Sequence, residues 1–354
     1  MSSSPYPSKG SRALDFRSDN VAGMPPEVLE ALVRAAAGSD SAYGEDGWTQ
    51  RLQATLADLF EHEVSVFIVA TGTAANALAL STLVPPWGAV LCHEEAHIAT
   101  DECGAPELLT GGAKLIPLSG PHAKLDPATI EERLSRSSRG VHHVQPAAVS
   151  LSQSTEAGTV YTVAEVGAIG DACRRHGLRL HMDGARFANA LAHLGCAPAE
   201  VTWRVGADVL SFGLTKNGAA TAEAVIFFDR SLARDFAYRR KRTGHLFSKM
   251  RFVSAQFEAL LSNRLWLRLA AQANAMATKL SEGLVRLPGI RLLHPVEANE
   301  LFVLLPEARI ATLERAGFLF YRWECAEGPC VRLVTAFDTE SAHIDGLLAA
   351  LRGL

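Results

Sequence analysis

The chain has 354 residues, of which 48% are apolar and 20% are charged, and its formal net charge is −4. This composition is typical of a soluble enzyme with one large and one smaller domain, and the charge gives no electrostatic basis for binding nucleic acid. No apolar stretch approaches the roughly 20 residues needed to cross a bilayer, so we expect no membrane partner.

The first residues, MSSSPYPSKGSR, contain Ser, Pro and Lys but no apolar core of a secretory signal. We therefore expect a flexible tail over residues 1–14. The six cysteines are widely spaced and form no C-x-x-C pair. This usage indicates reduced thiols and a cytoplasmic protein.

Helical and strand patterns alternate along the first two thirds of the chain. Apolar residues at helical spacing predict helices over 26–38, 49–61, 71–83, 96–111, 126–136 (with Asp126 as N-cap) and 163–177. Short apolar and β-branched runs predict strands over 64–70, 88–95, 113–119, 147–154, 178–185, 207–213 and 223–229. Such alternation indicates an α/β fold in which helices cover a mostly parallel sheet, with ligands binding beyond the carboxyl ends of the strands.

The pattern changes after about residue 229. Long helical stretches continue to about residue 287, and shorter strands and helices follow. This predicts a large domain over 15–240 and a smaller C-terminal α+β domain over 241–354, with the boundary somewhere within 230–285.

A stretch of small residues, TGTAAN from Thr71, follows a predicted strand and opens a predicted helix. Small residues there let backbone N–H groups approach an anion at the positive helix end. The glycine spacing of a dinucleotide site and the G-K-[ST] ending of a P-loop are both absent. One phosphate on a small cofactor fits this stretch, and a purely structural turn is the alternative.

An acid and a lysine each follow an apolar strand: Asp183 in LRLHMDGARF and Lys216 in LSFGLTKNG. Asp183 is suited either to an ion pair with Arg186 or to the protonated ring nitrogen of a Schiff-base cofactor. Lys216 is either a surface residue or a desolvated amine that attacks a carbonyl. The order of phosphate cradle, acid and lysine resembles that of pyridoxal phosphate enzymes with the aspartate aminotransferase fold, so we expect Lys216 to bond to the cofactor.

Two further motifs have competing interpretations. HEEAH, from His93 to His97, satisfies the zinc-protease pattern, which needs both histidines on one helix face and Glu94 as base. Here the motif follows a strand directly, so we expect no metal and interpret His97 as a ring stacked on a planar cofactor. The basic stretch YRRKRTGHLFSK from Tyr238 is either a solvated helix face or a contact for a small anion.

Ordered motifs along nearly the whole chain resemble those of the L-threonine aldolases, which belong to the aromatic β-eliminating lyase branch of fold-type-I pyridoxal phosphate enzymes. These motifs are DFRSDN, AYGED, TGTAAN, AHI, HMDGAR, LTKNG and VRLVTAF. The resemblance implies an aspartate-aminotransferase-like fold and pyridoxal 5′-phosphate as cofactor. It also implies a homo-oligomer with active sites shared between subunits, commonly a tetramer.

The resemblance also implies roles for individual residues. Lys216 should carry the cofactor, Asp183 should hold its ring nitrogen, and His97 should stack on its ring. Gly72, Thr73 and Thr215 should bind the cofactor phosphate, and Ser18, Arg186 and Arg332 should bind the substrate carboxylate. Tyr43, Arg242 and Lys249 should reach the site of a neighbouring subunit. His143 should lie near the substrate hydroxyl.

The implied reaction is the reversible cleavage of L-threonine, L-allo-threonine and related β-hydroxy-α-amino acids, including those of the phenylserine type, to glycine and an aldehyde. The base is left open between His97, His143 and a water molecule. Racemisation of a small amino acid such as alanine is the alternative on the same fold. A non-enzymatic protein that keeps the fold and a zinc hydrolase are the alternatives from other classes.

Overall fold

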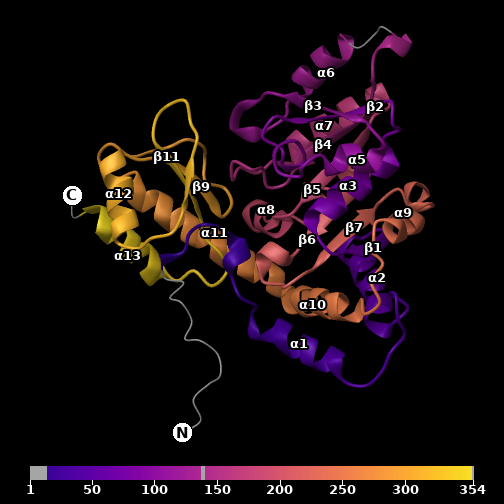
Figure 1. Cartoon of the computed structure of the whole chain (residues 1–354), viewed down its shortest axis with the longest axis horizontal. Helices are drawn as coiled ribbons and strands as arrows, with labels where there is room; N and C mark the ends of the chain where they lie inside the picture. The colour runs from indigo at the N-terminus through magenta and orange to yellow at the C-terminus, as the bar shows by residue number, and fades with distance from the viewer. Residues whose placement is uncertain (1–13, 137–139, 353–354) are drawn as a thin grey trace.

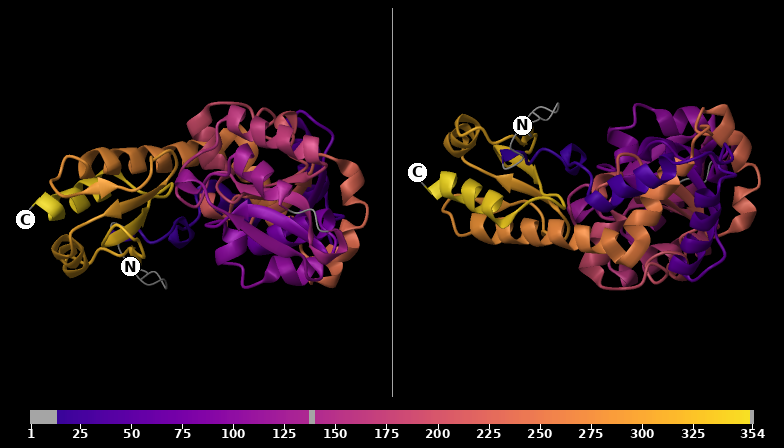
Figure 2. Two further views of the ribbon diagram at one scale, coloured as in Figure 1. Left: turned by 90° about the horizontal axis from the view of Figure 1, so that it is seen from above. Right: turned by 90° about the horizontal axis from the view of Figure 1, so that it is seen from below.

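The structure is a computed structural model that describes residues 14–136 and 140–352. Its two lobes are bridged by one long helix, α11 (Leu265–Leu284) (Figures 1 and 2). The expected flexible tail lies outside the described residues except for Leu14. The carbonyl oxygen of Leu14 accepts the N–H of Leu319 at 2.8 Å, so the chain is already held at this point.

A seven-stranded sheet in the order β1-β7-β6-β5-β4-β2-β3 forms the larger lobe. Neighbouring strands from β6 to β3 pair in parallel, whereas β7 is antiparallel to both β6 and β1. The predicted mostly parallel sheet is thus confirmed. The strands are β1 (Ser65–Val69), β2 (Gly88–His93), β3 (Lys114–Leu118), β4 (Gln145–Ser152), β5 (Arg179–Gly184), β6 (Val209–Gly213) and β7 (Glu223–Phe227).

Both faces of this sheet are buried. Successive side chains of a strand point to opposite sides, so a strand with consecutive apolar residues contributes to a core on each face. In β6, Val209 packs into the core on the α3 side and Leu210 into the core on the other side. Helices therefore cover both faces (Figure 1). They are α1 (Pro26–Ala36), α2 (Gly47–Phe60), α3 (Gly72–Leu83), α4 (His97–Thr100), α5 (Ala105–Thr110), α6 (Pro127–Ser135), α7 (Val163–His176), α8 (Phe187–Leu194), α9 (Phe236–Arg242) and α10 (Arg251–Leu261).

One helix prediction is wrong and one helix was missed. The stretch 96–111 forms two short helices, α4 and α5, because Cys103 and Gly104 adopt positive φ angles of 50° and 76° that a right-handed helix cannot contain. Helix α8 begins directly after Arg186 and had not been predicted. The N-cap prediction is confirmed, since the Asp126 side chain accepts the N–H of Ala128 at 2.9 Å.

The smaller lobe is a four-stranded antiparallel sheet, in the order β10-β11-β9-β8, packed against helices. Its core includes Phe16 from the other end of the chain, and Phe16 N–H donates to the carbonyl oxygen of Leu319 at 2.8 Å. The elements are β8 (Arg291–Leu292), β9 (Glu300–Leu304), α12 (Glu307–Arg315), β10 (Tyr321–Trp323), β11 (Cys330–Val334) and α13 (Ser341–Arg352).

Helix α11 belongs to both cores. Its first half contributes Trp266 and Ala270 to the core of the larger lobe, and its second half contributes Ala277 and Leu280 to that of the smaller lobe. A single helix shared in this way fixes the distance between the lobes. Within the described residues, none of the helices combines the length and the apolar character required to span a membrane.

Candidate active site

A cavity of about 370 Å³ opens where the parallel strands of the large sheet end, as expected for a ligand site in such a sheet. Four chain segments with sequence-predicted roles meet there: the start of α3, the start of α4, the end of β5 and the short 3₁₀ turn after β6. The lining residues with predicted roles are Gly72, Thr73, His97, Asp183, Arg186, Thr215 and Lys216.

The start of α3 forms one wall of the cavity. Thr71 caps this helix by accepting the N–H of Ala74 at 3.1 Å, so Gly72 and Thr73 lie in the first turn, where backbone N–H groups are free to bind an anion. Helix α3 itself is almost entirely buried in the core, which holds its end in place. Thr215, in the turn after β6, also lines the cavity and accepts the N–H of Ala222 at 3.1 Å.

A buried hydrogen-bond network fixes the orientation of Asp183. Asn76 donates to Asp183 Oδ2 and to Glu102 Oε1, each at 2.8 Å, and Glu102 Oε1 lies 2.9 Å from His97 Nδ1. The backbone N–H of Ala185 donates to Asp183 Oδ1 at 3.0 Å. The alternative pairing of Asp183 with Arg186 is not found among the described ion pairs, because Arg186 is bound elsewhere.

Arg186 is bound by two acids that come from distant parts of the chain. Its Nε donates to Asp19 at 2.7 Å, and its Nη1 lies 3.0 Å from Glu300 on β9. Glu300 also pairs with Arg332 on the neighbouring strand β11. Arg186 and Glu300 are almost completely buried, and two arginines facing two acids avoid the cost of unpaired buried charge. Arg186 and Arg332, which were predicted to hold a substrate carboxylate, are thus joined through Glu300, and Asp19 of the N-terminal segment completes the cluster.

Two buried acids in the cavity were not recognised from the sequence. Glu156 Oε1 accepts the backbone N–H of His97 at 2.8 Å and the hydroxyl of Ser152 at 2.7 Å. Glu223, the first residue of β7, lines the cavity near the start of α3. Burial raises the pKa of each carboxyl group to about 7. The sequence signal for both acids was a charged residue at or shortly beyond the end of an otherwise apolar strand. Whether such a residue faces the cavity depends on how the strands pair, which the sequence did not show.

The histidine pair of the zinc-protease pattern does not share a helix face. His93 ends strand β2, and its ring nitrogens contact the carbonyl oxygen of Gly120 at 3.0 Å and the N–H of Glu95 at 3.1 Å. His97 begins α4 and bonds to Glu102. Because one histidine is on a strand and the other on a helix, the geometry required for the zinc-protease mechanism is not formed.

A larger cavity of about 940 Å³ adjoins the first and extends between the lobes. It shares His97, Glu156, Arg186 and Lys216 with the first cavity and adds aromatic side chains from the smaller lobe. Ser18 lines it as well and caps a short turn by accepting the N–H of Asn20 at 3.2 Å. The residues that the smaller lobe contributes include His294, Phe302, Tyr321, Trp323 and Arg332.

Four residues with predicted roles do not line either cavity. Tyr43 is 52% exposed, and the ammonium group of Lys241 lies 5.2 Å from its ring. Arg242 and Lys249 flank a turn whose His245 accepts the N–H of Ala70, a cavity residue, at 3.3 Å.

His143 precedes β4, whereas the cavity lies at the far end of that strand, which is about 25 Å away for eight residues. His143 therefore does not lie at the cavity of its own chain.

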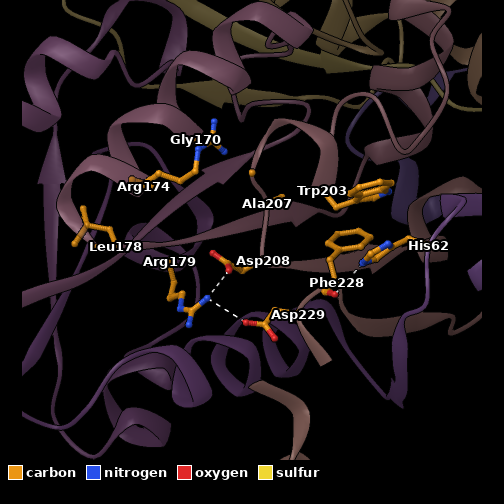
Figure 3. Close-up of a pocket in the computed structure, with 13 residues that line it drawn as sticks. His62, Gly170, Arg174, Leu178, Arg179, Trp203, Ala207, Asp208, Phe228 and Asp229 are labelled. Atoms are coloured by element: carbon orange, nitrogen blue, oxygen red, sulfur yellow. Dashed lines mark hydrogen bonds and ion pairs between the residues drawn. The ribbon is translucent and has the colours of Figure 1, made fainter. Parts of the chain in front are cut away.

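Another cavity, of about 480 Å³, lies at the opposite edge of the sheet (Figure 3). There Arg179 pairs with Asp208 at 2.8 Å and with Asp229 at 3.2 Å, and the rings of His62 and Trp203 stack with centroids 4.3 Å apart. These charged groups satisfy one another at the amino ends of β5 and β6. This cavity is consequently not the candidate active site.

The cavity at the carboxyl edge offers the groups that pyridoxal 5′-phosphate requires: an amine, an acid for the ring nitrogen, an imidazole and an anion cradle. Among the described residues, the buried hydroxyl of Ser154 also lines this cavity without a hydrogen-bond partner, as expected where a polar ligand binds. The fold and this site together define a pyridoxal-phosphate-dependent enzyme of fold type I.

Comparisons with known proteins agree with this class of enzyme. Residues 15–308 match the family model described as beta-eliminating lyase. A low-specificity L-threonine aldolase from a Pseudomonas species is 46% identical over 339 residues, which cover 96% of this chain and 97% of that protein. The structure of a threonine aldolase from Leishmania major superposes with a TM-score of 0.91 at 33% identity, covering 96% of this chain and 99% of the other. An alanine racemase from Cochliobolus carbonum is 31% identical, but over 66% of this chain and 59% of that protein.

The chain therefore belongs to the beta-eliminating lyase family, in the branch of the low-specificity L-threonine aldolases. This confirms the family resemblance, the fold type and the cofactor expected from the sequence.

Proposed function

We propose that this protein cleaves L-threonine, L-allo-threonine and related β-hydroxy-α-amino acids to glycine and an aldehyde, and that the reaction is reversible. The observation that carries the proposal is the shared cavity of Lys216 and Asp183, with Arg186 and Arg332 on the side that opens between the lobes. The identity of 46% to a low-specificity L-threonine aldolase, over nearly the full length of both chains, supports it.

The bound cofactor supplies an aldehyde that bonds to amines and a ring that stores electrons. Lys216 would hold this aldehyde until the substrate amine displaces it. Asp183, fixed by Asn76, would keep a proton on the ring nitrogen. Arg186 and Arg332 would hold the substrate carboxylate through their planar donor groups, which fixes rotation about Cα and so selects the bond that breaks.

The reaction also needs a group that removes the proton of the substrate hydroxyl. His97 lines the cavity, and because its Nδ1 bonds to Glu102, Nε2 is the nitrogen left for proton transfer. Its bond to Glu102 raises the pKa of His97 despite the opposing effect of burial. Glu156 is a second candidate, because its pKa of about 7 lets it accept a proton near neutral pH.

The substrate side chain would extend toward the cavity between the lobes. Phe302 and Trp323 meet edge to face there, with ring centroids 5.2 Å apart, and Tyr321 lies on the same wall. Such a wall suits an apolar or aromatic substituent at Cβ. We therefore include substrates of the phenylserine type in the proposal.

The decisive experiment is an assay of the purified holoenzyme with three amino acids. L-Threonine and L-allo-threonine should each yield glycine and acetaldehyde, whereas L-alanine should keep its configuration. Alanine racemisation without glycine release would instead establish the alternative supported by the racemase relative. A protein that binds the cofactor but releases no product from any of the three would be a non-enzymatic member of the fold.

We further propose a cytoplasmic homo-oligomer, a tetramer, in which Tyr43, Arg242 and Lys249 reach a neighbouring subunit's site. All six cysteines are free thiols, which suits a reducing compartment. A mixing experiment tests the shared sites. Lys216→Ala and Arg242→Ala subunits, each of low activity alone, should regain activity when co-assembled, because one hybrid site then has both residues. Additive activities in the mixture, or a monomer in sedimentation, would contradict the proposal.

A further inference from the structure

The buried acid Glu223 lies in the anion cradle itself. It is the first residue of β7 and is 6% exposed. Because β7 runs antiparallel to β6, its first residue reaches the same sheet edge at which the parallel strands end. The strand direction thus brings a carboxyl group to the place where the cofactor phosphate is expected.

The surrounding residues hold this carboxyl group in a defined slot. A Cβ atom added at Gly213 would lie 2.8 Å from Glu223 Oε2, so only the missing side chain of this glycine leaves room for the acid. The corresponding position at Gly72, the first residue of α3, is 3.8 Å from the same oxygen. Thr215 hydrogen-bonds to the carboxyl group. The acid therefore lies beside the residues that form the cradle.

An ionised carboxylate at this position would repel a phosphate, whereas a protonated acid can donate a hydrogen bond to it. The charged groups that face Glu223 are Lys216, which favours ionisation, and Asp183, which opposes it. Strands β1 and β6 and helix α3, which pack around it, contain no titratable side chain. On the neighbouring segment from α9 to α10, His245 accepts the N–H of Ala70, and Arg240 donates to the carbonyl oxygen of Ile68 on β1. Burial lowers the pKa of both groups, which favours the neutral form of His245.

We propose that Glu223 keeps its proton in the holoenzyme and donates a hydrogen bond to the phosphate of the cofactor. Thr215 would donate to the other oxygen of the acid and so orient it. Burial raises the pKa of Glu223 to about 7 in the protein alone, and a neighbouring phosphate would raise it further. The inference rests on the cofactor of the family and is independent of the reaction proposed above.

The inference has a measurable consequence for cofactor affinity. Since the bound phosphate favours the protonated acid, binding is strongest below the pKa of Glu223 and weakens as the pH rises through it. Pyridoxal, which lacks the phosphate, bonds to the same lysine without contacting the cradle. The ratio of the two dissociation constants therefore isolates the contribution of the phosphate.

The experiment is a titration of cofactor-free protein with pyridoxal 5′-phosphate and with pyridoxal between pH 6 and pH 9, followed by fluorescence or equilibrium dialysis. The quantity compared is the ratio of the dissociation constant of pyridoxal to that of pyridoxal 5′-phosphate. Between pH 6 and pH 9 this ratio should fall at least about tenfold more in wild-type protein than in Glu223→Gln, because the amide of glutamine donates a hydrogen bond at every pH. Glu63→Gln, which removes an exposed acid that pairs with Arg230 and does not line this cavity, should behave like wild type. Unchanged pyridoxal affinity shows that each variant is folded.

Two results would overturn the inference. One is the same pH dependence in wild type and Glu223→Gln. The other is tighter binding of the phosphorylated cofactor by Glu223→Gln at pH 6, which would show that the native acid is ionised and repels the phosphate. If Glu223→Gln does not fold, the infrared difference spectrum of wild-type holoenzyme minus apoenzyme decides. A protonated carboxylic acid band at pH 8 supports the inference, and its absence refutes it.

Discussion

Replacing Asp19 by asparagine tests whether the ion pairs that join the two lobes stabilise the fold. Asp19 is 2% exposed and accepts hydrogen bonds from Arg186 Nε at 2.7 Å, Arg186 Nη2 at 3.1 Å and Asn299 Nδ2 at 3.1 Å. Arg186 comes from the larger lobe, and Asn299 directly precedes β9 of the smaller lobe. The substitution keeps the shape of the side chain and removes its charge, so it isolates the electrostatic contribution.

The expected magnitude follows from the pKa of Asp19. Burial alone would raise this pKa, but Arg186, Lys216 and Asn299 outweigh burial and lower the value from 3.8 to about 2. At about 1.36 kcal/mol per pH unit, ionisation of Asp19 contributes about 2–3 kcal/mol to the free energy of unfolding. Since the folded pKa is the lower one, this contribution is complete above about pH 5 and is lost as the pH falls toward 2, with about half remaining at pH 3.

The assay is urea denaturation of the cofactor-free wild type and Asp19→Asn between pH 3 and pH 7, so that cofactor release does not contribute. The free energies of unfolding should differ by about 2–3 kcal/mol at pH 7, and the difference should shrink by about half at pH 3. Asp235→Asn is the control, because Asp235 is exposed and lies 3.9 Å from Arg234, and it should change stability by less than about 0.5 kcal/mol. A difference that does not depend on pH would refute the electrostatic reasoning.

Three further predictions concern the site and the packing around it. Lys216→Ala should abolish the visible absorbance of the cofactor bound through lysine, and an unchanged absorbance band would exclude Lys216 as the attachment point. Glu102→Gln should lower the pKa of His97, because the bond to Glu102 raises it in the native protein, and an NMR titration that shows no change would contradict this. Gly170→Ala should destabilise the protein by about 2 kcal/mol or more in urea denaturation, since the new Cβ would lie 2.0 Å from the carbonyl oxygen of Val205. Gly167→Ala in the same helix should be tolerated, because its Cβ would lie 3.6 Å from the nearest atom, and equal effects of the two substitutions would contradict the steric argument.

The chemistry-bearing residues at strand ends were predictable from the sequence. Asp183 and Lys216 each follow an apolar run that forms a strand, and the start of α3 follows another. In a parallel sheet such positions meet at one edge, so their convergence in one cavity follows from local pattern and general topology alone. The family motifs add the expected identity of the cofactor, because they occur in a fixed order along nearly the whole chain.

The partners of Arg186 were not predictable in this way. Asp19 is 167 residues away along the chain, and Glu300 lies on a strand of the other lobe. Asp19 belongs to the DFRSDN motif, but the motif does not indicate its partner, and Glu300 shows no local signal that distinguishes it from other acids. Similarly, the position of His143 at the far end of β4 became clear only when the direction of that strand was known.

The sequence alone determined most of the segments that form helices and strands, apart from the break within 96–111 and helix α8, because these properties depend largely on neighbours a few positions apart. The tertiary structure alone decided which acids face the arginines, and that Glu223 reaches the anion cradle. These outcomes depend on the antiparallel placement of β7 and on the packing of two lobes around α11. The physical reason is that a buried charge is stable only beside its partner, and partners far apart in sequence are selected by the packing of the whole chain.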